Sequence, residues 1–248
     1  MPVVISEPAA LPSVLGAYVS GLSARAIAQH GEFVVAVSGG SMSAVLGGGL
    51  CDRGDVDFGK WRVFFADERC VPLSHADSNF AGCDAALFSK LDALPRAHVY
   101  TIDEAALSDP EEAARRYAAE LERISGGRID LALLGMGPDG HTASLFPGHA
   151  LLDATDDRLV AHIEDSPKLP PCRITLSLKA LRAAGAVAFV ATGASKADVL
   201  GTLVSKAADG SYAICPDRGF PATIISPDAT WFWDTPLAAA LAANEAAA

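Results

Sequence analysis

Asp139 and His141 stand two residues apart in a glycine-rich segment that follows a short apolar run. An aspartate at this spacing can orient an imidazole and stabilise its protonated form, and histidine titrates near neutral pH. The pair therefore predicts general acid–base chemistry, with His141 as the group that moves the proton. An isolated histidine is more often structural, and we assign that default role to the histidines at positions 30, 75, 98, 149 and 162.

The segment around this pair also matches a dinucleotide-binding pattern, Gly-x-Gly-x-x-Gly, over residues 135–140. Pro138 removes a backbone donor from such a phosphate cradle, and Pro147 cuts short the long helix that the pattern requires. We therefore expect no dinucleotide cofactor. The segment instead presents Asp139 and His141.

A second segment, Ser38-Gly39-Gly40-Ser41, lies between an apolar run and an expected helix. Glycines let the backbone approach a ligand closely, and the N–H groups at a helix start favour an anion. Ser41 is expected both to cap the helix and to donate to a phosphate. The alternative is an ordinary tight turn between a strand and a helix.

Two cations are candidates for holding the same anion. Lys196 follows Thr192-Gly193 and is expected in the first turn of a helix, where a cation is unfavourable unless it holds an anion. Arg173, just before another strand-like run, is the second phosphate candidate. A solvated surface lysine is the plain alternative for Lys196.

Asp67-Glu68-Arg69 follows a third apolar run directly. Arginine offers a planar fork for a carboxylate or an oxyanion, and an aspartate at a strand end is held rigidly. The segment is therefore a candidate for the site, with a local salt-bridge cluster as the alternative.

The elements that must position these residues are short, continuous apolar runs separated by helical stretches. Continuous runs are typical of strands covered on both faces, and their alternation with helices predicts a mainly parallel sheet. We expect an α/β fold of the doubly wound, Rossmann-like kind with helices on both faces. Its strands are Phe33–Val37, Val63–Ala66, Leu131–Leu134 and Val187–Ala191, with Ile174–Leu178 and Thr223–Ile225 as possible additions.

In a sheet of this kind the carboxyl ends of the strands open on one edge, where ligands bind. The candidate segments each follow or precede one of these strands, so we expect them to form one site. The remaining chain predicts an amphipathic helix through Leu11, Leu15 and Val19, and another that Asp109 caps and Pro110 begins. No boundary is evident, and residues 1–248 are expected to form a single domain.

The composition limits the function classes. Half of the 248 residues are hydrophobic, which excludes a largely disordered chain. The net charge is −11 without a basic cluster, so neither nucleic acid nor an anionic membrane is an expected partner. Five scattered cysteines lack zinc spacing and predict reduced thiols, no metal site and a cytoplasmic location. Neither a signal peptide nor a membrane-spanning apolar stretch is expected.

At these residues the chain resembles the family that contains 6-phosphogluconolactonases and glucosamine-6-phosphate deaminases. The resemblance implies a modified Rossmann-like fold, no metal or other cofactor, and a sugar-phosphate lactone as substrate. It implies hydrolysis of 6-phospho-D-glucono-1,5-lactone to 6-phospho-D-gluconate in the oxidative pentose phosphate pathway. The matching segments keep the family order over nearly the whole chain: residues 38–41, 65–72, 134–147, 165–168 and 173–176, and Thr192-Gly193-x-x-Lys196.

Two positions favour the lactonase branch of this family. The deaminases continue their Asp-Gly-His core with Ile-Ala-Phe-Asn-Glu-Pro, whereas Phe146 stands here in the place of that glutamate. Arg69 replaces the tyrosine of a deaminase-like Asp-Glu-Tyr. A lost carboxylate and a gained guanidinium suit lactone hydrolysis. A deaminase or isomerase, and a sugar-phosphate sensor without turnover, remain the alternatives.

The resemblance also implies a division of roles. His141, oriented by Asp139, would take a proton from water and return it to the ring oxygen, while Arg69 would stabilise the oxyanion. Asp67 would hold Arg69 or a sugar hydroxyl. The phosphate would lie on Ser38, Gly39, Gly40 and Ser41, on Lys196 and on Arg173. The protein is expected to be a monomer or a weak homodimer, and the sequence leaves open whether His149 or Lys168 enters the site.

Overall fold

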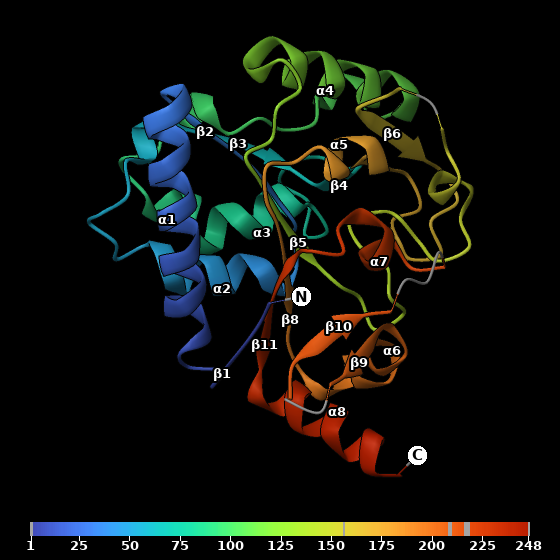
Figure 1. Ribbon diagram of the computed structural model, residues 1–248. Coiled ribbons are helices and arrows are strands. Elements are labelled where there is room, and N and C mark those ends of the chain that lie inside the picture. The colour runs from blue at the N-terminus through green and yellow to red at the C-terminus, as the bar shows by residue number, and fades with distance from the viewer. Residues whose placement is uncertain (1, 156, 208–209, 216–218, 248) are drawn as a thin grey trace.

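A six-stranded parallel sheet forms the centre of the computed structural model, which describes residues 2–155, 157–207, 210–215 and 219–247 (Figure 1). The strand order is β1-β11-β8-β5-β2-β3, and every neighbouring pair is parallel. The predicted doubly wound α/β fold is therefore confirmed. The six strands are β1 (Val3–Ser6), β2 (Phe33–Val37), β3 (Trp61–Phe65), β5 (Leu131–Gly135), β8 (Val187–Ala191) and β11 (Thr230–Asp234).

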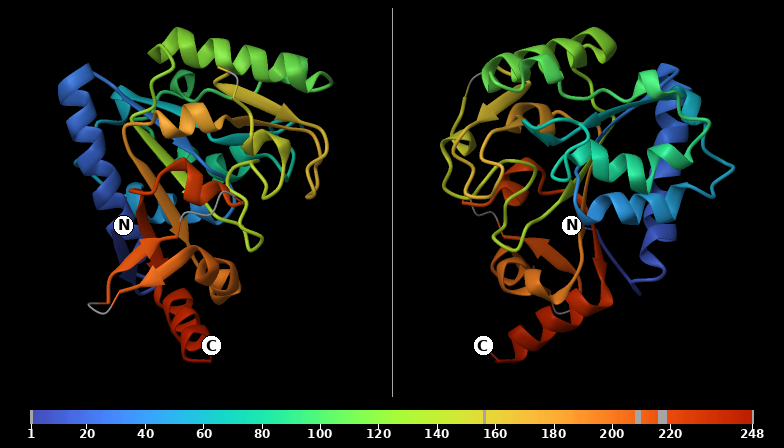
Figure 2. Two further views of the ribbon diagram at one scale, coloured as in Figure 1. Left: turned by 45° about the vertical axis from the view of Figure 1, so that its right-hand side comes forward. Right: turned by 180° about the vertical axis from the view of Figure 1, so that it is seen from behind.

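Helices cover both faces of this sheet (Figures 1 and 2). Successive side chains of a strand point to opposite faces, so Val34 and Ala36 pack in one core while Val35 and Val37 pack in the other. One face carries α1 (Leu11–His30), α2 (Ser41–Leu50) and α3 (Asn79–Ala86). The other carries α4 (Pro110–Ser125), α5 (Leu178–Arg182), α6 (Ala197–Leu203), α7 (Pro221–Ile225) and α8 (Thr235–Ala247).

Two small antiparallel sheets complete the fold. The first has the order β4-β7-β6, and the second pairs β9 with β10. Their bounds are β4 (Asp67–Arg69), β6 (Val160–Ile163), β7 (Arg173–Leu176), β9 (Val204–Lys206) and β10 (Tyr212–Ile214). Single 3-10 turns occur at Phe58–Lys60, Phe88–Lys90, Arg96–His98, Glu104–Ala106, Ala150–Leu152 and Ala194–Lys196.

The predicted start of the helix at Asp109 and Pro110 is confirmed. The Asp109 side chain accepts a hydrogen bond from the Glu112 amide, and Pro110 is the first helical residue of α4. One strand prediction is wrong, because Thr223–Ile225 belongs to α7. Pro221 begins that helix, where its fixed φ and missing N–H are tolerated. The run Ile174–Leu178 is a strand only to Leu176, since Ser177 caps α5 through a bond from Ala180.

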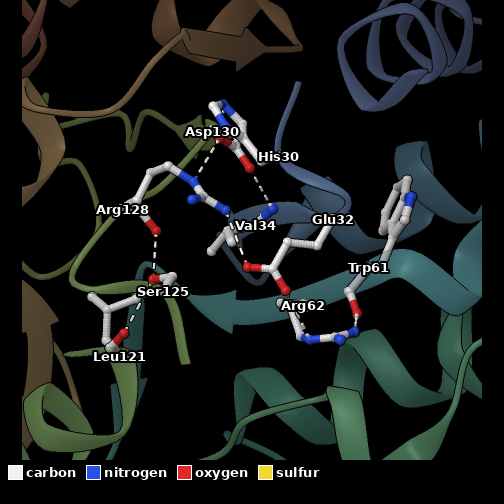
Figure 3. Close-up of polar contacts among 9 residues, drawn as sticks. All are labelled: His30, Glu32, Val34, Trp61, Arg62, Leu121, Ser125, Arg128 and Asp130. Atoms are coloured by element: carbon white, nitrogen blue, oxygen red, sulfur yellow. Dashed lines mark hydrogen bonds and ion pairs between the residues drawn. The ribbon is translucent and has the colours of Figure 1, made fainter. Parts of the chain in front are cut away.

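A polar network ties the amino ends of the central strands together (Figure 3). The Asp130 carboxylate accepts from the Val34 amide at 2.7 Å and from Arg128 Nε at 3.1 Å. Glu32 pairs with Arg128 at 3.1 Å and with Arg62 at 3.4 Å. The starts of β2, β3 and β5 are therefore fixed to one another, which leaves the opposite edge of the sheet for a site.

At the middle of that opposite edge, the chain leaves two neighbouring strands toward opposite faces of the sheet. β2 continues into α2 and then β3, whereas β5 leads through the opposite face to β8. The loops after β2 and β5 consequently separate, which is where open α/β sheets bind ligands. No helix in the described part of the chain is both long and apolar enough to cross a bilayer.

Candidate active site

The predicted segments meet around one cavity of about 170 Å³ at the carboxyl ends of β2, β5 and β8. Nine of the ten predicted site residues line it, and the tenth, Asp139, is bonded to His141. Residues from 38 to 196 are thus brought together, as expected for loops on one sheet edge. The lining comprises Ser38, Gly39, Gly40, Ser41, Asp67, Arg69, Asn79, Gly135, Met136, Gly137, His141, Ala143, Arg173, Val190 and Lys196.

The loop after β5 holds His141 and Asp139 in a fixed relation. His141 Nδ1 lies 2.5 Å from Asp139 Oδ1, and the imidazole stacks on Phe146 with ring centroids 4.9 Å apart. The Gly137 amide donates to the His141 carbonyl at 2.9 Å, and a Cβ at Gly137 would collide with the imidazole. A glycine is therefore required at 137. With Nδ1 engaged, Nε2 is the nitrogen left for a ligand.

The electrostatics of the loop favour a neutral imidazole beside an ionised carboxylate. Burial lowers the pKa of His141; Asp139 opposes this shift and Lys168 adds to it. Burial acts to raise the pKa of Asp139, but its bonds to His141 and Lys168 prevail and hold that pKa below the usual range. A neutral histidine accepts a proton, so the arrangement suits a general base.

Asp67 and Arg69 flank the cavity from β4, but they do not pair with each other in the described structure. The Asp67 carboxylate accepts from Ser144 Oγ at 2.7 Å and from Asn79 Nδ2 at 3.2 Å. Arg69 Nη1 donates to the Asp77 carbonyl. Of the two roles expected for Asp67, the contact with Arg69 is wrong, because its carboxylate accepts from uncharged donors. The contact with a sugar hydroxyl stays a prediction. The alternative interpretation, a local salt-bridge cluster within Asp67-Glu68-Arg69, is also wrong for the described residues.

Arg69 keeps one donor unused. Its Nε is shielded from solvent and has no hydrogen-bond partner in the described part of the chain. Arg69 also lines the cavity, and a guanidinium carries further N–H donors that fit an anion. Arg69 is therefore suited to bind an oxyanion.

The Ser38–Ser41 loop presents backbone rather than side chains. Gly40, with φ of +66°, is the N-cap of α2, and Ser41 is the exposed first helical residue without a side-chain cap bond. The expectation that Ser41 caps the helix is wrong by one residue, because only glycine adopts this φ easily. A Cβ at Gly39 would collide with the Asn79 amide, so this turn also needs glycine.

Lys196 ends the 3-10 turn before α6 and is the N-cap of that helix, one position before the predicted first turn. Its Nζ donates to the Thr192 carbonyl, which leaves two donors of the ammonium for other partners. Burial lowers the pKa of Lys196, and Asp234 opposes that shift. The cost of burying this cation favours an anion beside it.

Arg173 lines the cavity, but its donors are mostly committed elsewhere. Its Nε donates to the Pro170 carbonyl at 2.9 Å, and Nη2 donates to the Lys168 and Leu169 carbonyls at 2.9 and 3.1 Å. The residue is only 2% exposed. Its clearest contact is therefore with the segment 168–170 rather than with open space for a phosphate.

Four residues of this region were either given no role by the sequence or left open, and the first two are Asn79 and Glu68. Asn79 begins α3, with Ser78 as its N-cap, and lines the cavity. Glu68 accepts from the amides of Asn79 and Phe80 at 2.7 and 2.9 Å. Glu68 stands eleven residues before Asn79, and no local pattern in the sequence links the two.

Of the two residues left open, His149 does not line the cavity. Its Nε2 lies 3.1 Å from Asp165, and its Nδ1 accepts from the Leu151 amide. Lys168 does not line the cavity either, but its Nζ lies 3.0 Å from Asp139 Oδ2 and 3.4 Å from His141 Nδ1. The described residues contain no group of three or more His, Cys, Asp or Glu side chains placed to hold a metal ion.

This combination of sheet edge, glycine turn and His–Asp loop defines a class that sequence comparison also finds. The profile of the family described as glucosamine-6-phosphate isomerases/6-phosphogluconolactonase matches residues 6–233, so the chain belongs to that family.

Several similar proteins carry the name 6-phosphogluconolactonase. A probable 6-phosphogluconolactonase of Schizosaccharomyces pombe is 42% identical over 206 residues, which cover 79% of this chain and 80% of the relative. The 6-phosphogluconolactonase of Rattus norvegicus is 39% identical, covering 90% and 88%. The solved 6-phosphogluconolactonase of Trypanosoma brucei superposes with a TM-score of 0.78 over 97% of this chain and 98% of that one. At 24% identity, that similarity shows the fold alone.

Proposed function

We propose that the protein hydrolyses 6-phospho-D-glucono-1,5-lactone to 6-phospho-D-gluconate, the second step of the oxidative pentose phosphate pathway. The observation that carries the proposal is His141, bonded through Nδ1 to Asp139, on a cavity that also holds Arg69, Lys196 and a glycine turn. The names of the relatives from yeast and rat support the same reaction.

The phosphate group would lie at the start of α2. There the backbone of Gly39, Gly40 and Ser41 lines the cavity, and helix-start amides favour an anion. Lys196 supplies the positive charge from the neighbouring loop. Since the net charge of the protein is −11, a phosphate must be held by such local features against the overall field. Arg173 belongs to the lining, and its main task is to hold its own loop.

Hydrolysis then needs one proton carried in both directions. Water attacks the C1 carbonyl, its oxygen bonds to C1, and its proton passes to His141 Nε2. Asp139 stabilises the imidazolium that forms, and Arg69 binds the oxyanion of the tetrahedral intermediate. The bond from C1 to the ring oxygen breaks, and His141 returns the proton to that oxygen. No covalent nucleophile is required, because a δ-lactone is already an activated ester.

A deaminase or isomerase is the second candidate within the family, and the geometry around His141 disfavours it. The residue that stands in place of the deaminase glutamate, Phe146, is buried and stacks on the imidazole. Asp67 is the only carboxylate among the lining residues, and its oxygens accept from Ser144 and Asn79. Proton transfer between sugar carbons needs a further acid that the described cavity lacks.

The cellular setting is part of the proposal. All five cysteines are free thiols, in keeping with a reducing cytoplasm. We propose a monomer or weak homodimer with a single domain, whose partner is the sugar-phosphate lactone and not nucleic acid.

The reaction class is tested with freshly prepared lactone in a pH-stat, after subtraction of spontaneous hydrolysis. We expect acid release well above the uncatalysed rate, and no ammonia release from glucosamine 6-phosphate. Ammonia release with an uncatalysed rate of lactone opening would establish the deaminase. Binding of both compounds without turnover would establish a sensor.

A further inference from the structure

Lys168 contacts the His141–Asp139 pair but is not among the residues that line the cavity. Its Nζ is 3.0 Å from Asp139 Oδ2, while His141 occupies Asp139 Oδ1. The same Nζ is 3.4 Å from His141 Nδ1. Each carboxylate oxygen of Asp139 thus has its own partner, and the lysine touches both members of the pair.

The backbone of Lys168 is fixed from two directions. Ser166 Oγ accepts from the Lys168 amide at 3.2 Å and donates to the Lys168 carbonyl at 2.8 Å. The buried guanidinium of Arg173 donates to the carbonyls of residues 168, 169 and 170. A side chain with four rotatable bonds is costly to order, and a held backbone lowers that cost. A segment with a fixed backbone therefore positions Lys168 beside Asp139.

We propose that Lys168 is a positioning residue of the acid–base pair: it fixes the orientation of Asp139 and places a positive charge beside the imidazole. It acts through His141 and not on the substrate, because the cavity is lined by His141 but not by Lys168. The expected effect of Lys168 on the reaction rests on the proposed function. Its expected effect on the titration of the imidazole rests on the contacts alone.

The charges acting on the imidazole come from three elements. Asp139 belongs to the same loop, Lys168 to the segment before β7, and Asp67 to β4. The two carboxylates favour the imidazolium, whereas the ammonium favours the neutral ring. Burial is the largest cause of the lowered pKa of His141, and the Lys168 ammonium adds to it against the two carboxylates. Without Lys168, burial alone would oppose the effect of Asp139, so the pKa of the imidazole should rise.

The test compares Lys168→Met and Lys168→Arg with the wild-type protein, and uses Lys179→Met as the matched control. Lys179 is a surface lysine that pairs with Asp157 at 2.8 Å, away from the cavity lining. In Lys168→Met, the acidic limb of kcat/KM should move to higher pH, and kcat should fall roughly 3- to 30-fold with KM nearly unchanged. Lys168→Arg keeps the charge and should restore the wild-type limb.

A second readout needs no turnover. In the free protein, the imidazole resonance of His141, identified by its loss in His141→Ala, should titrate at higher pH in Lys168→Met than in wild type or Lys179→Met. An unmoved titration, an arginine variant that behaves like the methionine variant, or a rise confined to KM would each overturn the inference. If the wild-type protein does not hydrolyse the lactone, the proposed function is refuted. The titration of His141 then remains as the test of Lys168.

Discussion

The two nitrogens of His141 face different partners, and the proposed chemistry depends on that division. Nδ1 is held by Asp139, so the proton that moves in the reaction is the one at Nε2. The stack on Phe146 and the close approach of Gly137 restrict the ring to one plane. Such preorganisation matters because a misplaced base loses much of its effect on rate.

Also at the scale of single residues, a Lys196 variant distinguishes phosphate binding from the chemical step. Lys196→Met should raise KM roughly 10- to 100-fold, the worth of a charge-assisted hydrogen bond to phosphate, with kcat little changed. Steady-state kinetics with the lactone measure the two constants. Lys179→Met is again the matched control and should behave as wild type. A Lys196 variant with the KM of the control would clear this lysine of phosphate binding.

The sequence predicts a contact between two site residues only where the partners are local. Asp139 lies two positions from His141, so the spacing alone indicates the pair. Lys168 and Asn79 contact residues that are distant in the sequence. Arg173 holds the loop that carries Lys168, and Glu68 holds the helix start that carries Asn79. The periodicity of the sequence does not predict such long-range contacts. Ser41 lines the cavity, but the N-cap is Gly40, whose positive φ the sequence alone does not indicate.

At the scale of elements, the last turn of α2 packs closely against α1. A Cβ at Gly16 in α1 would collide with the Gly49 carbonyl of α2, so the two backbones approach directly. Gly16→Ala should therefore destabilise the fold by about 1–3 kcal/mol, the usual cost of overpacking. Gly21→Ala, in the same helix, meets only Arg25 Nη1 at 3.9 Å.

This second glycine serves as the control for the first. Because alanine favours helix and has room at 21, Gly21→Ala should raise stability by about 0.5–1 kcal/mol. Urea unfolding of both variants measures the difference. A Gly16 variant as stable as the Gly21 variant would show that the close approach of α1 and α2 is not required.

The strands that the sequence predicted are the continuous apolar ones. Phe33–Val37 and Val187–Ala191 match β2 and β8 residue for residue, since both are buried on each face. The run Thr223–Ile225 has β-branched residues but follows Pro221 and forms a helix. β11 was not predicted, although it carries Trp231 and Trp233, because only its long-range pairing with β1 and β8 defines it. Tertiary context outweighs local propensity in both places.

At the scale of the whole molecule, the site unites residues from the first and last thirds of the chain on one sheet edge. The amino ends of β2, β3 and β5 are tied by Glu32, Arg62, Arg128 and Asp130 (Figure 3). The carboxyl ends are left to loops that carry a cation or a glycine turn within a protein of net charge −11. This arrangement supports the proposal that the site binds a small anion beside one base.

The central claim is that His141 is that base, and its replacement tests the claim most directly. In a pH-stat with fresh 6-phospho-D-glucono-1,5-lactone, corrected for spontaneous opening, His141→Ala should lower kcat roughly 10²- to 10⁴-fold. KM should stay near the wild-type value, because the phosphate contacts are untouched. Circular dichroism of the variant establishes that the fold is retained. A folded His141→Ala protein that opens the lactone at nearly the wild-type rate would contradict the account.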